Sequence, residues 1–135
     1  MSLTGEEQFA YTFDLGTIHL DSDDLKSPLI SLPSTDKFYV SGAQIAANAA
    51  VNVNGTSYQT VSLCTGAGSC FAYISTEGTC FVQSAWQDFA LYSSGTACSY
   101  YVIPASCTIY ATYQKGGDGH SIFGCNIRLV MSAYK

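Results

Sequence analysis

The feature that most constrains this chain is an alternation of apolar and polar residues with a period of two. It is clearest near the C-terminus, where apolar residues alternate with Asn126 and Arg128. An amphipathic helix would need an apolar period near 3.6, so this stretch predicts a strand with one buried and one solvated face. The side chains expected on the buried face are Phe123, Cys125, Ile127, Leu129, Met131 and Ala133.

The same alternation recurs over residues 9–15, 60–63 and 107–114, and turn-forming residues separate these segments. Asn54-Gly55 is predicted to form a type I′ hairpin turn, and residues 116–119 a tight hairpin. The alanine-rich stretch 43–50 is read as strand or loop. About eight or nine short strands then fit in the chain, which predicts an all-β fold, a single antiparallel β-sandwich or jelly roll of about eight strands.

The length of 135 residues is that of one ordinary domain. Residues 1–8 contain acidic side chains and no apolar periodicity, so they are predicted to form a flexible N-terminal arm. The β-sandwich domain is expected to occupy residues 9–135.

Charged residues are scarce, at 11% of the chain, and the net charge is −5. The five basic residues are scattered, so no basic stripe is available for nucleic-acid phosphates or for an anionic membrane surface. A surface built from Ser, Thr, Asn, Gln and Tyr loses little ionic hydration on contact with another protein. The composition therefore favours protein partners and argues against nucleic acid and membrane.

No pattern typical of catalysis is present. The chain lacks a Gly-x-Ser-x-Gly elbow and a Cys-x-x-Cys pair, and its two histidines lie far apart in the sequence. The acidic run 21–24, near His19, is interpreted as a solvated turn rather than a calcium loop, because the EF-hand pattern is absent. We therefore predict no catalytic residue, no metal site and no cofactor.

The six cysteines suggest disulfides in an oxidising compartment. Cys64 and Cys70 flank a short loop and are expected to face each other across two paired strands. Cys98 and Cys107 flank a longer connection and are the second candidate pair. The alternative is that cysteines serve as small buried apolar residues.

Aromatic residues carry the remaining signal, since tyrosine is amphipathic and enriched at protein interfaces and sugar-binding faces. The candidate interface residues are Tyr58, Tyr73, Tyr92, Tyr100, Tyr101 and Tyr110. Trp86, followed by Gln87 and Asp88, is a candidate sugar contact, and the alternative is that Trp86 anchors the core.

Several blocks, taken in order, resemble the small β-sandwich virion proteins of tailed bacteriophages, above all the capsid decoration (cement) proteins. The blocks are residues 14–18, 29–33 and 37–45, then 45–50 with 55–63, then 101–112, and finally 116–119 leading into 125–134. Together they cover roughly residues 12 to 134. The six cysteines depart from this family, whose members assemble in a reducing cytoplasm.

The resemblance implies a non-enzymatic virion structural protein on the capsid surface that forms a homo-oligomer, expected to be a trimer, and binds capsid protein subunits. It implies no catalytic residue. A carbohydrate-binding or host-attachment module is the alternative, and an enzyme whose site is assembled only by folding is the third hypothesis.

Overall fold

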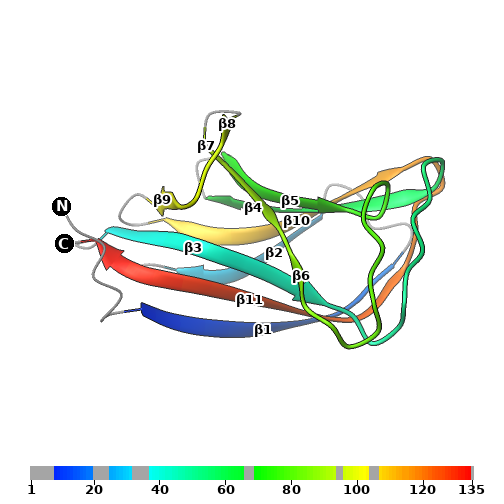
Figure 1. Cartoon of the computed structure of the whole chain (residues 1–135), viewed down its shortest axis with the longest axis horizontal. Coiled ribbons are helices and arrows are strands. Elements are labelled where there is room, and N and C mark those ends of the chain that lie inside the picture. Colours follow the sequence, from blue (N-terminus) through cyan, green and yellow to red (C-terminus); the bar gives the residue numbers. More distant parts are fainter. Residues whose placement is uncertain are drawn as a thin grey trace.

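The computed structural model describes residues 8–19, 25–31, 37–65, 69–93, 96–103 and 107–134. Its regular elements are all strands, arranged in two packed antiparallel sheets (Figure 1). The predicted all-β sandwich is therefore confirmed. The described residues contain no helix long and apolar enough to cross a membrane.

One sheet has five strands in the order β1-β11-β3-β6, with β9 also pairing with β3. The bounds are β1 (Gln8–Ile18), β11 (Ile122–Tyr134), β3 (Lys37–Ala46), β6 (Gln87–Asp88) and β9 (Tyr101–Ile103). The first and last strands are thus neighbours, and β11 lies at the centre of the sheet. The alanine-rich stretch 43–50, read from the sequence as strand or loop, contains both, since β3 ends at Ala46 and irregular backbone follows.

The second sheet has six strands in the order β2-β10-β4-β5-β7-β8. The bounds are β2 (Leu25–Ser31), β10 (Thr108–Gly116), β4 (Tyr58–Thr65), β5 (Cys70–Ser75), β7 (Ala90–Ser93) and β8 (Thr96–Ala97). The described part of the chain holds eleven strands rather than the eight or nine expected. The excess comes from β6, β8 and β9, which have two or three residues each and are too short to show a period.

The core lies between the sheets and is built by the predicted alternation. Along β10, Ile109, Ala111 and Tyr113 are buried while Tyr110 and Thr112 are only half-buried. Fully buried side chains from the two sheets meet in one cluster, which includes Ile45, Leu63, Phe71, Ile109, Ile127, Leu129 and Met131. Burial of this continuous apolar layer is the main force holding the sheets together.

The start of β11 departs from strict alternation. Phe123 was expected in the core but is 51% exposed, and Ile122 is fully buried in its place. The cause is Gly124, whose φ of +60° produces a bulge that shifts the register between β11 and β1. A bulge adds one residue to a strand, so every side chain beyond it changes face.

Both predicted hairpin turns take other forms. Residues 116–119 do make a tight turn, closed by a 3.0 Å hydrogen bond from Gly119 N to Gly116 O, but they join two strands of different sheets. Gly55 has no positive φ, so Asn54-Gly55 is not a type I′ turn. Instead the Asn54 side-chain oxygen accepts hydrogen bonds from Thr56 N and Ser57 N, because a short amide can satisfy the backbone of a turn.

Candidate functional site

Four of the six candidate tyrosines lie on the outer face of the six-stranded sheet. Strand pairing sets their neighbours: Ser62 lies between Thr112 of β10 and Tyr73 of β5, and Tyr110 lies opposite Cys64. We call this surface the tyrosine face. It consists of Tyr58, Tyr73, Tyr92 and Tyr110, with Thr60, Ser62 and Thr112 between them.

The tyrosine face carries rings and hydroxyl groups and almost no charge. Strands β4, β5 and β7 contain no charged residue at all. Tyr73 is 41% exposed, and its ring meets that of Tyr92 edge-on at 5.6 Å between centroids. Such a pair presents a rigid, amphipathic surface with little side-chain freedom to lose on contact.

Tyr58 covers the end of this face. It pairs with Gly116 of β10, and a Cβ at Gly116 would collide with the Tyr58 ring. The absence of a side chain at Gly116 therefore lets the Tyr58 ring approach the backbone of β10 closely.

The other two candidate tyrosines lie elsewhere. Tyr101 is in β9 and stacks on buried Phe71, with ring centroids 4.8 Å apart and planes 7° apart. Tyr100 is 41% exposed and packs against buried Tyr39 at 5.3 Å. Pairing of β9 with β3 places Tyr101 in the five-stranded sheet, and the contact with Tyr39 of β3 places Tyr100 beside the same strand, so neither belongs to the tyrosine face.

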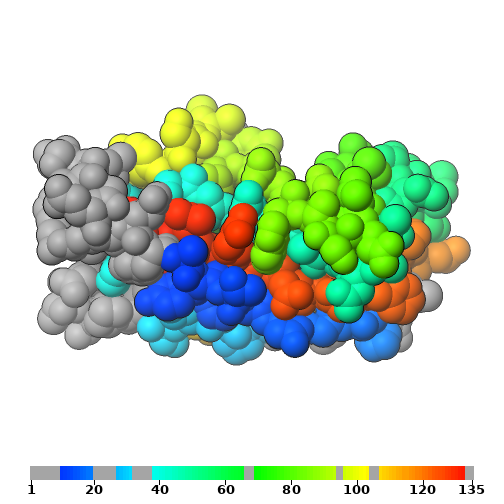
Figure 2. Space-filling view, turned by 60° about the horizontal axis from the view of Figure 1, so that its bottom comes forward, coloured from blue at the N-terminus to red at the C-terminus, as the bar shows by residue number. Residues whose placement is uncertain are grey.

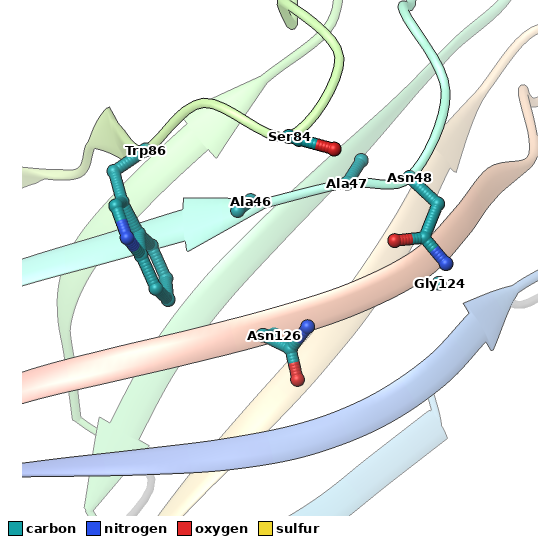
Figure 3. A pocket seen from close by; sticks show the side chains of 7 residues that line it. All are labelled: Ala46, Ala47, Asn48, Ser84, Trp86, Gly124 and Asn126. Atoms are coloured by element: carbon teal, nitrogen blue, oxygen red, sulfur yellow. The ribbon is translucent and has the colours of Figure 1, made fainter.

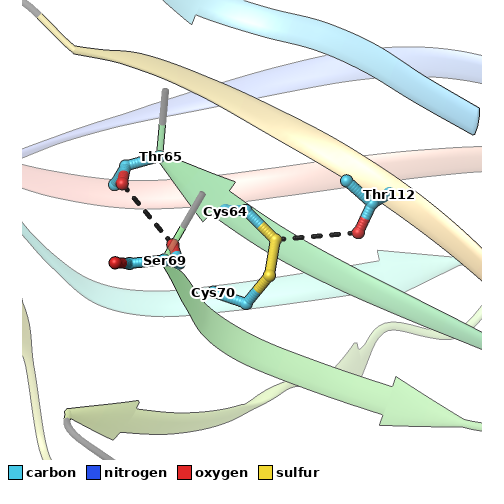
Figure 4. Close-up of a disulfide and its surroundings, with 5 residues drawn as sticks. All are labelled: Cys64, Thr65, Ser69, Cys70 and Thr112. Carbon is cyan, nitrogen blue, oxygen red and sulfur yellow. Dashed lines mark hydrogen bonds between the residues drawn. A yellow bond between two sulfur atoms is a disulfide. The ribbon is translucent and has the colours of Figure 1, made fainter. Parts of the chain in front are cut away.

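Cys64 and Cys70 form a disulfide across the β4–β5 pair (Figure 4). The Cys64 sulfur lies 3.6 Å from the hydroxyl of Thr112, on the tyrosine face. Thr65 N donates to Ser69 O at 2.9 Å and closes the connection just inside the bridge. The two sulfurs thus join neighbouring strands at one end of the tyrosine face.

The expected Cys98–Cys107 bridge is absent, and both residues are free thiols. Each of the two side chains is half-buried and packs against the apolar core. Cys98 follows β8 in the chain, and Cys107 precedes β10. Their burial follows the alternative reading of cysteine as a small apolar residue. Cys80 is an exposed free thiol, and Cys125 is fully buried.

Burial also changes the titration of Cys125. The pKa of this thiol is raised to about 12, mainly because burial removes the water that would stabilise the thiolate. A hydrogen bond with the Ile18 backbone lowers the pKa, and the negative charge of Asp14 raises it. Desolvation likewise raises the pKa of Tyr113, whose hydroxyl donates to Ser27 Oγ at 3.0 Å. Both groups are neutral in the folded protein at physiological pH.

The outer face of the five-stranded sheet has a different chemistry. Strand pairing aligns Arg128, Gln44 and Asp88 in one row. The Arg128 guanidinium donates two hydrogen bonds to Gln44 Oε1, one of them at 2.8 Å from Nε, and Gln44 Nε2 donates to Asp88 Oδ1 at 2.9 Å. Trp86 covers the row, with its ring centroid 4.5 Å from the guanidinium carbon. The chain's single tryptophan and single arginine are thus in contact.

Trp86 also forms one wall of a depression of about 220 Å³ (Figure 3). We call it the Trp86 pocket. It is lined by Ala46, Ala47, Asn48, Ser84, Trp86, Gly124 and Asn126. Figure 2 shows the segment before β6, in green, lying against β11 in orange and β1 in blue. Trp86 is 37% exposed, so it is not the core anchor that the alternative reading suggested.

The sequence offered Gln87 and Asp88 beside Trp86 as the sugar contact, but neither of them lines the pocket. Asn48, Ser84 and Asn126 are ordinary polar residues in the sequence, and only folding brings them together. The signal that was present is the glycine in Phe123-Gly124-Cys125, because a glycine inside an alternating strand often marks a bulge or a close approach. A Cβ at Gly124 would in fact collide with the Asn48 side chain.

Within the residues that the structure describes, the remaining sequence candidates form no further site. His19 is exposed at the end of β1, and the acidic run 21–24 lies outside the described residues, as do residues 1–7 of the predicted arm. Among the residues that the structure describes, no group of three or more His, Cys, Asp or Glu side chains gathers at metal-binding distance.

No protein-family model matches the chain, and no curated protein matches it. A solved structure of the arabinose-bound α-L-arabinofuranosidase MgGH51 aligns with 96% of this chain, at 12% identity and a TM-score of 0.36. The chain spans 23% of that enzyme's length. A TM-score this low does not establish a shared fold, and the arabinose in that structure says nothing about this chain.

Proposed function

We propose that this protein is a non-enzymatic virion structural protein, a capsid decoration protein that oligomerises and stabilises the shell through protein–protein contacts. The observation that carries the proposal is the tyrosine face, a broad sheet surface with four tyrosines. Three of the strands that form it, β4, β5 and β7, contain no charged residue. Interface cores are enriched in tyrosine and depleted of charged residues.

The energetics favour docking at this face over permanent exposure. The hydroxyl and aromatic side chains lose far less hydration free energy on being covered than ionised side chains would, and the Tyr73–Tyr92 ring pair has few rotamers to lose. Tyrosine is enriched among interface hot spots, the few residues whose truncation to alanine costs about 2 kcal/mol or more. Binding that exists only in the assembled shell would stabilise the shell by mass action.

The disulfide suits a location on a virion surface. Disulfides persist on secreted proteins and virion surfaces and are rare in reducing cytoplasm. Cys64 and Cys70 lie at the end of the tyrosine face, so their oxidation after release would link two of the strands that present it.

A second candidate function, carbohydrate binding or host attachment, is favoured by a separate observation, the Trp86 pocket. The two functions are compatible because they use the outer faces of different sheets. A protein docked through the six-stranded sheet would present the five-stranded sheet outward.

Native mass spectrometry of the purified chain tests the docking proposal. We expect an oligomer, and Tyr73→Arg should weaken its association about 30-fold or more, because an arginine would bring an unpaired charge into the interface. The matched control is Ala10→Arg, which adds the same charge at an exposed strand position of the other sheet. It should leave the oligomer intact.

Purified virions of the phage that carries the gene should contain the chain in a copy number comparable with that of the capsid protein. A monomer at every concentration, or equal weakening by both variants, would contradict the use of the tyrosine face. Absence of the chain from virions would contradict the decoration role.

A further inference from the structure

We infer that the Trp86 pocket is a binding site for a single neutral sugar ring, with Trp86 as the stacking surface and Asn48, Ser84 and Asn126 as the hydrogen-bonding groups. The inference assigns residues to the carbohydrate-binding alternative and is independent of docking through the tyrosine face.

The polar groups of the pocket are available to a ligand. In the described part of the chain, the side chains of Asn48, Ser84 and Asn126 make no hydrogen bond to another residue. Two amides and one hydroxyl supply both donors and acceptors. Sugar hydroxyls require both at once, and figure 3 shows the two amides and the Trp86 ring around one space.

The backbone around the pocket is irregular in two places. Ser84 has a φ of +58° and is the only described residue other than glycine with a positive φ. Gly124, on the opposite wall, forms the bulge of β11 with a φ of +60°. Strained residues persist where the surrounding structure holds them, and both strain and bulges gather at functional sites.

The structure holds both irregularities in place. Ser84 N donates to Ala47 O at 2.8 Å, and Asn48 N donates to Phe123 O at 2.8 Å. These bonds tie the segment before β6 and the segment after β3 to each other and to β11. The pocket walls are therefore fixed before any ligand arrives, which reduces the entropy lost on binding.

Trp86 is fixed by the row beneath it. Arg128 lies against the ring, Gln44 accepts two hydrogen bonds from Arg128, and Asp88 accepts one from Gln44. The guanidinium is thereby occupied by Gln44 and the ring, and it is not part of the pocket lining. An immobilised indole is the surface that stacks on the apolar face of a sugar ring.

The size and charge of the pocket define the ligand class. Its lining contains no ionised side chain, so it offers no counter-charge to a phosphate or a carboxylate. Its volume of about 220 Å³ is below the usual range for drug-sized ligands, roughly 300–1,000 Å³. One uncharged ring with several hydroxyls fits both limits.

Tryptophan fluorescence measures this site directly, because Trp86 is the only tryptophan in the chain. We would titrate the full chain with the methyl pyranosides of glucose, galactose, mannose and N-acetylglucosamine, and with glucuronate. At least one neutral sugar should give a saturable change in emission, with a dissociation constant on the order of 1 mM. Glucuronate should bind no more tightly than glucose.

Asn126→Asp, which keeps the side-chain shape, and Asn126→Ala should each weaken binding of the responding sugar about fivefold. The matched control is Gln114→Ala, which removes an exposed amide from the other sheet and should leave binding unchanged. Tyr73→Arg should also bind sugar normally, which separates this site from the docking proposal. No saturable response to any sugar, tighter binding of glucuronate, or equal effects of Asn126→Ala and Gln114→Ala would overturn the assignment.

Discussion

The two outer faces of the sandwich are both built from antiparallel strands, but they differ in shape and in chemistry. On the six-stranded sheet, regular pairing of β10, β4 and β5 spreads tyrosines and hydroxyls over a broad area. On the five-stranded sheet, the Gly124 bulge and the segment before β6 create a small pocket beside a charged row. Regular pairing makes a surface suited to a large partner, whereas a break in pairing makes a recess suited to a small one.

The largest expected effect comes from removing the bulge at Gly124 on the outer face of the five-stranded sheet. Gly124→Ala should destabilise the fold by about 2–4 kcal/mol, because a Cβ at a φ of +60° is strained and would collide with Asn48. Thermal unfolding should show a fall in Tm of roughly 10 °C. Sugar binding at the Trp86 pocket should be lost with it.

Gly42→Ala is the control for this change. Gly42 lies in β3 of the same sheet, and a Cβ there would meet only the Val130 side chain at an ordinary 3.7 Å. We expect a change within about 0.5 kcal/mol. Equal losses from both glycine variants would mean that the bulge is not a special feature of this face.

The next effect concerns the regular face. Replacing Cys64 and Cys70 together by serine should reduce the free energy of unfolding by about 2 kcal/mol, as loop-closure entropy predicts for a sequence separation of 6. Denaturant titration with and without reductant measures the loss. Cys80→Ser, at an exposed free thiol, should change nothing. A wild-type protein that is insensitive to reductant would show that the bridge does not stabilise β4 against β5.

The smallest expected effect concerns the buried thiol of Cys125, in the core between the two sheets. Because burial raises the pKa of Cys125 to about 12, the unfolded chain loses this proton first as pH rises. The free energy of unfolding therefore keeps its full contribution from the protonated thiol below the ordinary pKa near 9. That contribution is lost progressively between about pH 9 and 12. At pH 10 the loss from Cys125 alone is about 1 kcal/mol.

Cys125→Ala should flatten this part of the alkaline stability profile, measured by denaturant titration at a series of pH values. Tyr113, whose pKa is also raised by burial, should leave a residual decline in the same direction. A profile that is equally steep in wild type and variant would show that Cys125 ionises normally in the folded protein.

The sandwich was predictable because long strands with one buried face must show a period of two, and β10 and most of β11 do. The bulge was not, since one glycine with a positive φ reversed the expected positions of Phe123 and Ile122, which precede it, and left the alternation from Cys125 onward as expected. The short strands β6, β8 and β9 were missed because two or three residues carry no measurable period.

The candidate sites divide in the same way. Tyr58, Tyr73, Tyr92 and Tyr110 share a face because alternation and register place them there. Trp86 was a candidate from its residue type alone, but Arg128, Asn48 and Asn126 reach it only through pairing of β11 with β3 and the turn after β3. Pairing between distant strands is not encoded in local residue patterns, so such partners are visible only in the folded chain.

The pairing of the first strand with the last has a practical consequence. Gln8 lies opposite Ser132, so the beginning of β1 and the end of β11 are adjacent at one edge of the sandwich. A short linker between these points would permit a circular permutant, with new ends opened at the exposed Asn54-Gly55 loop. Cargo joined directly to the beginning of β1 or to the end of β11 would start from this end of the sandwich and not from the tyrosine face.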